Sequence, residues 1–277
     1  MKAITALSFG LVAAMAATGA QAGSYQTEVG GAYLKQNGDF VDATGMVVGG
    51  TYALKPIDTS KGPLAEAAFL NPTSTASAAI VKISIDAFGG TADGTVSELG
   101  FDYVDNNLPV LLGATFSKGS GDIGDSTGYG LKAGYYATPT LLVGASYGSD
   151  KTDDTGTVDT ETTLAVTAKW LNTGAMTYAV EGGYTSEKSS GDSGDSSDSS
   201  IGLGATYYLD GTLGLGASFS KASGDTKTDE GSTVGVHVSK YFAGNVGVFL
   251  GYDKFSVSDT AQGEDNTTIT LEVAARF

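Results

Sequence analysis

The sequence contains no cysteine, and it has only five prolines, one histidine and one tryptophan among 277 residues. Its mean hydropathy is near zero, at +0.01. After position 22 no stretch approaches the roughly 20 consecutive apolar residues that a membrane-spanning helix needs. These absences exclude a disulfide-stapled domain and a helical membrane protein. Scarce proline is typical of a chain whose strands must donate backbone hydrogen bonds to a ladder.

Basic residues are scarce as well. The chain has 31 acidic and 15 basic residues, which gives a formal net charge of −16. Because nucleic-acid binding requires basic patches, the composition predicts no nucleic-acid partner. Glycine is abundant with 41 residues, and 14 tyrosines outnumber 11 phenylalanines.

The N-terminus has the pattern of an export signal. Lys2 supplies a basic start, an apolar run follows to Ala20, and Ala20-Gln21-Ala22 fits the small-x-small cleavage pattern. We predict a signal peptide at residues 1–22 and a mature domain at residues 23–277; a buried N-terminal helix is the alternative. A barrel closed by backbone hydrogen bonds needs no disulfide in an oxidising compartment.

The C-terminus alternates strictly between apolar and polar residues. One face of the last run ends in Leu271, Val273, Ala275 and Phe277, while the other carries Glu272 and Arg276. Successive strand side chains point to opposite sides, so this strand has one apolar and one polar face. A soluble sandwich strand could show the same stripe, but a final strand ending on phenylalanine resembles the assembly signal of Gram-negative outer-membrane barrels.

About 14 such runs fill the mature chain, an even number as bacterial barrels have. They are 25–33, 46–54, 79–85, 99–103, 110–116, 129–135, 141–147, 164–170, 176–184, 201–207, 213–219, 234–238, 246–252 and 267–277. We predict an all-β fold, a transmembrane antiparallel up-and-down β-barrel of about 14 strands, with 12 or 16 as alternatives and both termini periplasmic. Aromatics near run ends suit interfacial girdles: Tyr25, Tyr33, Tyr52, Tyr103, Trp170, Tyr184, Tyr207 and Phe277.

The connections between runs alternate in length. Tight turns are predicted at Asn106-Asn107, 138–140, 172–174, Asp210-Gly211 and Gly244-Asn245, and longer acidic loops at 119–127, 149–160, 186–200, 223–232 and 258–266. This asymmetry matches short periplasmic turns and long extracellular loops. The loops would place carboxylates around one mouth: Asp150, Asp153, Asp154, Asp159, Asp192, Asp195, Asp198, Asp225, Asp229, Glu230, Glu264 and Asp265.

One connection, residues 55–74, is much longer than the other turns on its side. Pro63, the helix formers from Leu64 to Leu70, and Asn71-Pro72 as a stop predict a short helix, with a plain irregular loop as the alternative. Its apolar residues could cap the periplasmic mouth of the barrel.

The segments YALKPIDT (52–59) and GPLAEAAFL (62–70) resemble a porin family of Gram-negative bacteria. With the signal peptide and terminal Phe277 as assembly signal, the resemblance covers the whole chain. It implies an outer-membrane channel in contact with membrane lipid, lipopolysaccharide and the barrel assembly machinery. The chain lacks the long in-folded constriction loop, with its Pro-Glu-Phe-Gly-Gly-Asp-type motif, of trimeric general porins, so monomer and trimer both stay open.

A barrel of this size is wide enough to hold water, so its inward face decides function. In the third run we read Ala79, Val81, Ile83 and Ile85 as lipid-facing. By the same parity the predicted pore-lining residues are Glu28, Lys82, Asp86, Glu98, Asp102, Lys132, Lys169, Glu181, His237, Glu272 and Arg276. Charges on the lipid side would cost roughly 2–4 kcal/mol for Lys or Arg at the midplane. An open pore and a lumen braced by ion pairs are the two readings.

Nothing in the sequence predicts an enzyme, a cofactor or a metal site. His237 lacks a nearby acid or nucleophile, so a pore-lining or hydrogen-bonded role is favoured over catalysis. The segment 191–198, GDSGDSSD, lacks the spacing of known calcium motifs, which leaves a solvated loop or a weak divalent-cation site near lipopolysaccharide.

The predicted function is an outer-membrane porin, a passive diffusion channel for small hydrophilic solutes and ions. Carboxylates at the mouth and inside favour a weak cation preference. The alternative is a non-channel structural or adhesive surface barrel that acts through its acidic extracellular loops.

Overall fold

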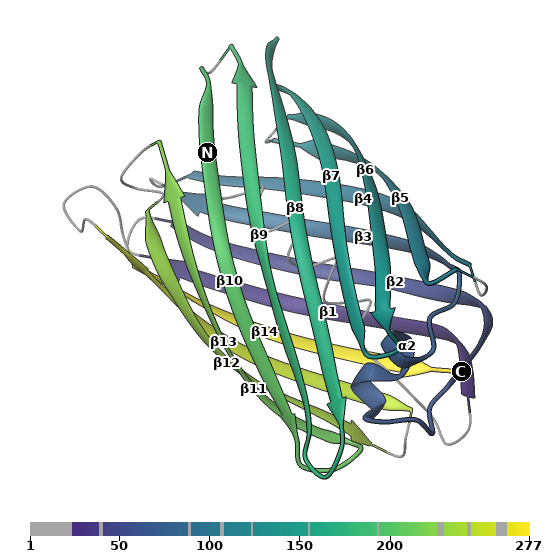
Figure 1. Cartoon of the computed structure of the whole chain (residues 1–277). Helices are drawn as coiled ribbons and strands as arrows, with labels where there is room; N and C mark the ends of the chain where they lie inside the picture. Colours follow the sequence, from purple (N-terminus) through teal and green to yellow (C-terminus); the bar gives the residue numbers. More distant parts are fainter. Residues whose placement is uncertain are drawn as a thin grey trace.

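The computed structural model describes residues 24–38, 41–87, 90–105, 108–122, 124–154, 156–192, 194–225, 230–242, 245–258 and 265–277. The predicted signal peptide lies outside these residues. The strands are β1 Ser24–Gly38, β2 Val41–Asp58, β3 Thr75–Ala87, β4 Gly90–Val104, β5 Val110–Gly121, β6 Asp125–Thr138, β7 Leu141–Asp154, β8 Thr157–Thr173, β9 Thr177–Gly191, β10 Ser196–Tyr208, β11 Leu213–Gly224, β12 Gly231–Phe242, β13 Val246–Val257 and β14 Asn266–Arg276. A 3-10 turn, η1 Leu64–Glu66, and a short helix, α2 Ala67–Leu70, complete the fold (Figure 1).

The strands form one closed antiparallel barrel. Each strand pairs with its neighbour in sequence, and β1 pairs with β14 to close the sheet. The prediction of a 14-stranded up-and-down barrel is therefore confirmed. The start of β1 and the end of β14 lie at the same end of the barrel, where Phe277 is bonded to Gln26 and Thr27, and Figure 1 shows the C-terminus there, next to α2. We call it the periplasmic end because outer-membrane barrels have their short turns there.

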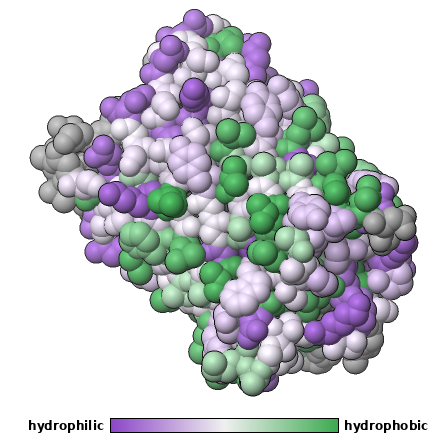
Figure 2. All heavy atoms as spheres, in the orientation of Figure 1, coloured by the Kyte–Doolittle hydropathy of each residue, from purple (hydrophilic) through white to green (hydrophobic). Residues whose placement is uncertain are grey.

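Large apolar side chains cover the outer wall. Leu99, Leu131, Leu203 and Val236 are among many that are more than half exposed, which is costly in water and favourable in lipid. Figure 2 shows hydrophobic side chains across the middle of the visible face and hydrophilic ones concentrated toward its upper end. Among the described residues, no helix is long and apolar enough to cross a membrane.

Three of the five predicted acidic loops, at 119–127, 149–160 and 186–200, are mostly strand, so their predicted lengths were wrong. Strand β5 continues to Gly121 and β6 starts at Asp125, while β7 continues to Asp154 and β8 starts at Thr157. The apolar alternation ends where a strand leaves lipid, but backbone pairing continues because both faces are then in water. Asp150 pairs with Glu161 in this extension. Of the predicted mouth carboxylates, Asp229 and Glu264 lie outside the described residues, as do Asn106, Asn107 and Gly244 of the predicted turns.

The predicted faces of β3 were reversed. Lys82 pairs with Met46, and Ile80 pairs with Val48; directly opposed residues share a face. Because Met46, Val48 and Ile80 are all about half exposed on the outer wall, Lys82 and, by parity, Asp86 also point outward. The prediction that Lys82 and Asp86 line the pore is therefore wrong.

The inner face of β3 is apolar instead. Val81 and Ile83 are buried against Leu34 and Val47 from β1 and β2. Since β3 is apolar on both faces, hydrophobicity did not identify its lipid side. A second face was also misread: a register shift between Tyr25 and Thr27 turns Tyr25 inward, where it is buried, rather than into the lipid-facing girdle.

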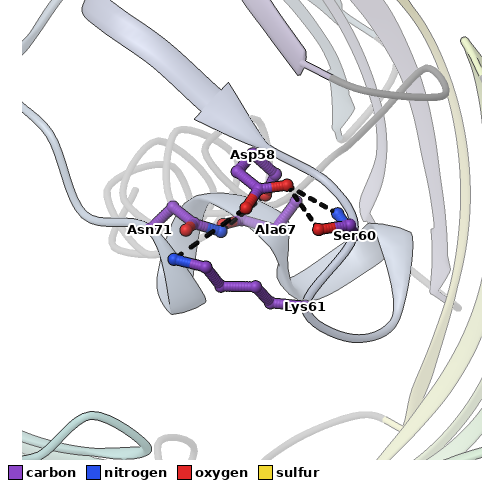
Figure 3. Close-up of polar contacts among 5 residues, drawn as sticks. All are labelled: Asp58, Ser60, Lys61, Ala67 and Asn71. Carbon is purple, nitrogen blue, oxygen red and sulfur yellow. Dashed lines mark hydrogen bonds and ion pairs between the residues drawn. The ribbon is translucent and has the colours of Figure 1, made fainter.

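The connection between β2 and β3, which we call the periplasmic insert (residues 59–74), contains the predicted helix. η1 and α2 form where the sequence predicted one to two turns after Pro63, so the helical reading is confirmed. Asn71 Nδ2 donates hydrogen bonds to the carbonyl oxygens of Asp58 and Ala67, and Asp58 accepts bonds from both the N–H and the hydroxyl of Ser60 (Figure 3). These bonds close the insert on itself.

Candidate functional site

Strand register places nine of the predicted pore-lining residues on the inner face of the barrel. They are Glu28, Glu98, Asp102, Lys132, Lys169, Glu181, His237, Glu272 and Arg276. Each occupies the parity opposite to exposed outer residues such as Leu99, Leu131 and Val236. The barrel lumen is therefore the candidate site, and its charges determine what it accepts.

Every basic residue on the described inner wall is held by a carboxylate. Lys132 Nζ lies 2.9 Å from Asp102 Oδ1, and Lys169 Nζ lies 2.8 Å from Glu66 Oε2. Arg276 is almost fully buried and forms an ion pair with Glu28. The positive charges of the lumen are thus neutralised locally.

Further carboxylates on the same wall form no ion pair with a described cation. Glu98, Asp150, Glu181, Asp253 and Glu272 belong to this set. Ser117 donates a hydrogen bond to Asp150 over 3.4 Å. The excess of carboxylate over basic side chains in the lumen is larger than predicted, because Asp150 and Asp253 join the inner wall while Lys82 and Asp86 both leave it.

The periplasmic insert lies inside the barrel and crosses its mouth. Ala67 packs against Tyr25, Ala53 and Ile57 on β1 and β2. On the other side of the barrel, Phe69 packs against the cluster of Leu171, Ala179 and Tyr208 from β8, β9 and β10. Figure 1 shows α2 at the end where β14 terminates. A segment that touches both sides of the wall narrows the periplasmic opening.

Glu66 is the polar anchor of the insert. Its side chain is buried between β8 and β10, where it accepts a hydrogen bond from the Tyr208 hydroxyl over 2.5 Å and pairs with Lys169. Backbone bonds add to this hold: Leu64 N–H donates to Gly211 O over 2.8 Å. A buried carboxylate needs such partners, so the geometry fixes the insert in one position.

The single histidine has a defined setting on the inner wall. His237 Nε2 lies 3.0 Å from the Thr206 hydroxyl, and its ring stacks on Phe249 with centroids 5.3 Å apart. This agrees with a hydrogen-bonded, lumen-facing role. No group of three or more His, Asp and Glu residues that could hold a metal occurs in the described part of the chain.

Sequence reasoning missed several lumen residues. We predicted Asp150 in a loop, but β7 continues through this position, and its alternation places the Asp150 side chain on the inner face. Asp253 occupies an inward-facing position of β13, so the same alternation rule could have identified it. Glu66 carried no such signal, because its position inside the barrel depends on tertiary packing of the insert.

The closed barrel with a lipid-facing belt and a charged lumen defines an outer-membrane β-barrel of a Gram-negative bacterium. Residues 1–161 match the model of a family described as "Putative general bacterial porin". The chain belongs to this porin family. A search of curated proteins returned no match.

Solved structures agree on the architecture. The outer membrane protein Omp33 of Acinetobacter baumannii is 25% identical, with a TM-score of 0.57 over 93% of this chain and 100% of that chain. The toluene transporter TodX of Pseudomonas putida is 11% identical, with a TM-score of 0.57 over 95% of this chain and 97% of that one. The translocator domain of the autotransporter NalP from Neisseria meningitidis is 12% identical, with a TM-score of 0.53 over 91% and 89%. The last two likenesses show the fold alone.

Proposed function

We propose that the protein is a passive diffusion channel for small hydrophilic solutes and ions, with a weak preference for cations. The single observation that carries the preference is the excess of inner-wall carboxylates that remains once Lys132, Lys169 and Arg276 are each paired with one. What a passing ion then meets is a wall with unpaired carboxylates.

The physical basis of the preference is the local field. Carboxylates such as Glu98 and Asp150 raise the local concentration of cations in a lumen with low-dielectric walls. Glycine alternates with them on the inner wall, for example Gly100 and Gly113, and small residues leave space for water. The preference is weak because the lumen also has an apolar section around Val81 and Ile83.

The size limit comes from the periplasmic insert. Its contacts with both sides of the wall leave less than the full cross-section of the barrel for a solute. In trimeric general porins a loop folded in from the extracellular side has this role; here the narrowing segment comes from the opposite end. We therefore propose small solutes as the substrate class.

The environment of the channel follows from its location. We propose processing after residue 22, assembly by the barrel machinery with Phe277 as signal, and contact with lipopolysaccharide in the outer leaflet. We propose no catalytic role for His237. Glu181 and Asp253 act on its ring electrostatically, but its ring is held by the hydrogen bond with the Thr206 hydroxyl and by stacking on Phe249.

The test is the reversal potential across a KCl gradient in a planar bilayer. We expect a potential of the sign for cation preference, and a smaller one for the variant E98Q/D150N. The control D86N removes a carboxylate from the outer face of β3 and should leave the potential unchanged. Anion preference would overturn the proposed selectivity, and no conductance at all would favour the non-channel surface barrel.

A further inference from the structure

The outer wall carries a ring of lysines at one height. The odd-numbered strands run from the periplasmic to the extracellular end. Each has one exposed lysine at a lipid-facing position near its extracellular end. We call this set the lysine girdle: Lys35, Lys82, Lys118, Lys151, Lys188, Lys221 and Lys254. The selectivity of the lumen makes no use of these residues, because they point away from it.

The register shows that the girdle is level. Lys35 pairs with Thr44 and Thr44 with Ser84, while Lys82 is two residues closer to the periplasm than Ser84. Strands about 4.8 Å apart and tilted by roughly 35–45° require a descent of about one residue per strand to keep constant height. The offset between Lys35 and Lys82 is therefore the one that a horizontal ring needs.

Most other neighbours on the girdle descend in the same way, for example Lys82 to Lys118 through Thr95 and Ser120, but two pairs deviate from it. Lys118 and Lys151 lie in one row through Thr127. Lys254 pairs with Thr267, which pairs with Asn37, two residues above Lys35. Because these deviations cancel around the circuit, the girdle as a whole keeps the average descent of about one residue per strand that constant height on a staggered sheet requires.

The girdle lies at the upper edge of the lipid-facing band. Tyr33, Phe116, Phe219 and Tyr252 are exposed aromatics two residues below four of its lysines. Leu141 and Lys151 are ten residues apart on β7, which at a tilt of about 40° is roughly 25 Å of height, the height of the apolar band of such barrels. The ammonium groups therefore stand where lipid headgroups begin.

The lysines are largely available to a partner. Of the seven girdle lysines, only Lys254 forms an ion pair with a described residue, Asp265, at 3.6 Å. The described residues of the periplasmic end form no comparable ring: Lys61 and Lys240 pair with Asp58 and Asp210 at 3.9 Å, and Lys55 stands apart from them. In a chain with a net charge of −16, this concentration of positive charge faces one leaflet.

We propose that the lysine girdle binds the phosphate groups of the glycolipid of the outer leaflet, lipopolysaccharide. A ring that surrounds the whole barrel at headgroup height fits a lipid leaflet rather than a single protein partner. A compact ammonium binds phosphate as a point charge, and its position above the aromatics lets the acyl chains pack on the apolar band. The inference rests on the outer-membrane location and assigns a site to the lipopolysaccharide contact proposed above.

The test uses the full-length barrel in detergent, titrated with lipopolysaccharide and followed by native mass spectrometry. The variant K118Q/K151Q removes two neighbouring lysines, and a second variant replaces all seven by glutamine. We expect binding to weaken about fivefold for each lysine removed. K118R/K151R should keep wild-type affinity, and the matched control K55Q/K61Q, at the opposite end, should bind as tightly as wild type.

Three further ligands identify the source of the phosphate. Dephosphorylated lipopolysaccharide and phosphatidylglycerol should bind at least tenfold more weakly, and millimolar inorganic phosphate should not compete. Equal affinity of K118Q/K151Q and wild type, or phosphatidylglycerol binding as tight as that of lipopolysaccharide, would overturn the proposal. Bilayer conductance of the variants checks their folding independently, and we expect it to be unchanged. If the wild type did not conduct but still bound lipopolysaccharide through the girdle, only the proposed channel function would be refuted.

Discussion

Arg276 and Glu28 are directly paired in the register between β14 and β1, and their side chains form an ion pair on the inner face of the closing seam. The guanidinium also lies over the rings of Tyr25 and Tyr241, at 4.5 and 5.4 Å from their centroids. One of its N–H groups donates to Leu64 O of the insert over 3.4 Å. Arg276 therefore joins the first strand, the last strand and the insert.

Replacing Arg276 by methionine should destabilise the barrel strongly. The substitution removes the guanidinium that pairs with the buried Glu28 carboxylate, and breaking a buried ion pair costs about 3–5 kcal/mol. The free energy of unfolding in denaturant, measured on the barrel in lipid vesicles, checks this. The double variant E28Q/R276M should recover part of the loss, whereas equal stability of R276M and wild type would show that the pair does not hold the seam.

The insert should be loosened by removal of Glu66. In E66A the hydroxyl of Tyr208 and the ammonium of Lys169 lose their acceptor, a cost of about 1–3 kcal/mol. We expect larger and noisier single-channel currents, because the insert then leaves its seat in a fraction of molecules. K61A breaks only the exposed pair with Asp58 and should conduct like wild type; unchanged currents in E66A would argue that the insert does not limit passage.

The sequence predicted the barrel well because alternation records a physical constraint. A strand with lipid on one side and water on the other must alternate, and the runs ending at Tyr207 and Phe219 do so without exception. Where that constraint is missing, prediction failed. β3 buries Val81 and Ile83 on its inner face and shows Ile80 to lipid, so composition alone did not distinguish its sides; pairing with β2 did.

The candidate site was predictable only in part. Parity along single strands located Glu98, Asp102 and Lys132, but the ion pair between Lys132 and Asp102 joins two strands that are not adjacent, β4 and β6. Pairings of this kind depend on the three-dimensional register. The anchor of Glu66 on β8 and β10 depends in addition on where the insert folds, which no local pattern encodes.

Acid should weaken the β10–β11 turn. The hydroxyl of Thr212 donates to the Asp210 carboxylate, as do its backbone N–H and that of Leu213. These bonds hold the pKa of Asp210 below its usual range, and the bond from the Thr212 hydroxyl has the largest effect. A carboxyl with a depressed folded-state pKa adds stability above its unfolded pKa, near 3.9, and this is lost as pH falls through the folded value. Protease cleavage at the turn should therefore rise below about pH 4; in D210N it should be faster than wild type at neutral pH and independent of pH.

The cation preference should shrink at high salt. The Debye length is about 10 Å at 0.1 M and about 3 Å at 1 M, so the field of Glu98 and Asp150 reaches across less of the lumen in concentrated solution. Reversal potentials at a constant KCl ratio but rising mean concentration measure the effect. A preference that did not change with salt would indicate selection by a narrow, desolvating constriction instead.

Deleting Phe277 should impair both folding and assembly, and two variants separate the contributions. The backbone of Phe277 is bonded to β1: its N–H donates to Thr27 O over 2.8 Å, and its carbonyl accepts from Gln26 and Thr27 at 2.8 and 3.0 Å. Its side chain is 66% exposed and packs little within the barrel. The deletion removes these seam bonds and places a terminal carboxylate on Arg276, whereas F277A keeps the bonds and removes only the interfacial aromatic ring.

We therefore expect the deletion to lower the refolding yield into detergent micelles, read as heat-modifiability on a gel, while F277A refolds like wild type. In cells both variants should show less surface-exposed, protease-resistant barrel, because we propose that assembly recognises the aromatic end of the closing strand. F277Y, which keeps an aromatic ring, is the matched control and should assemble normally. If F277A assembled as well as F277Y, the ring would have no role in recognition, and the terminal residue would act only through the hydrogen bonds that close β14 onto β1.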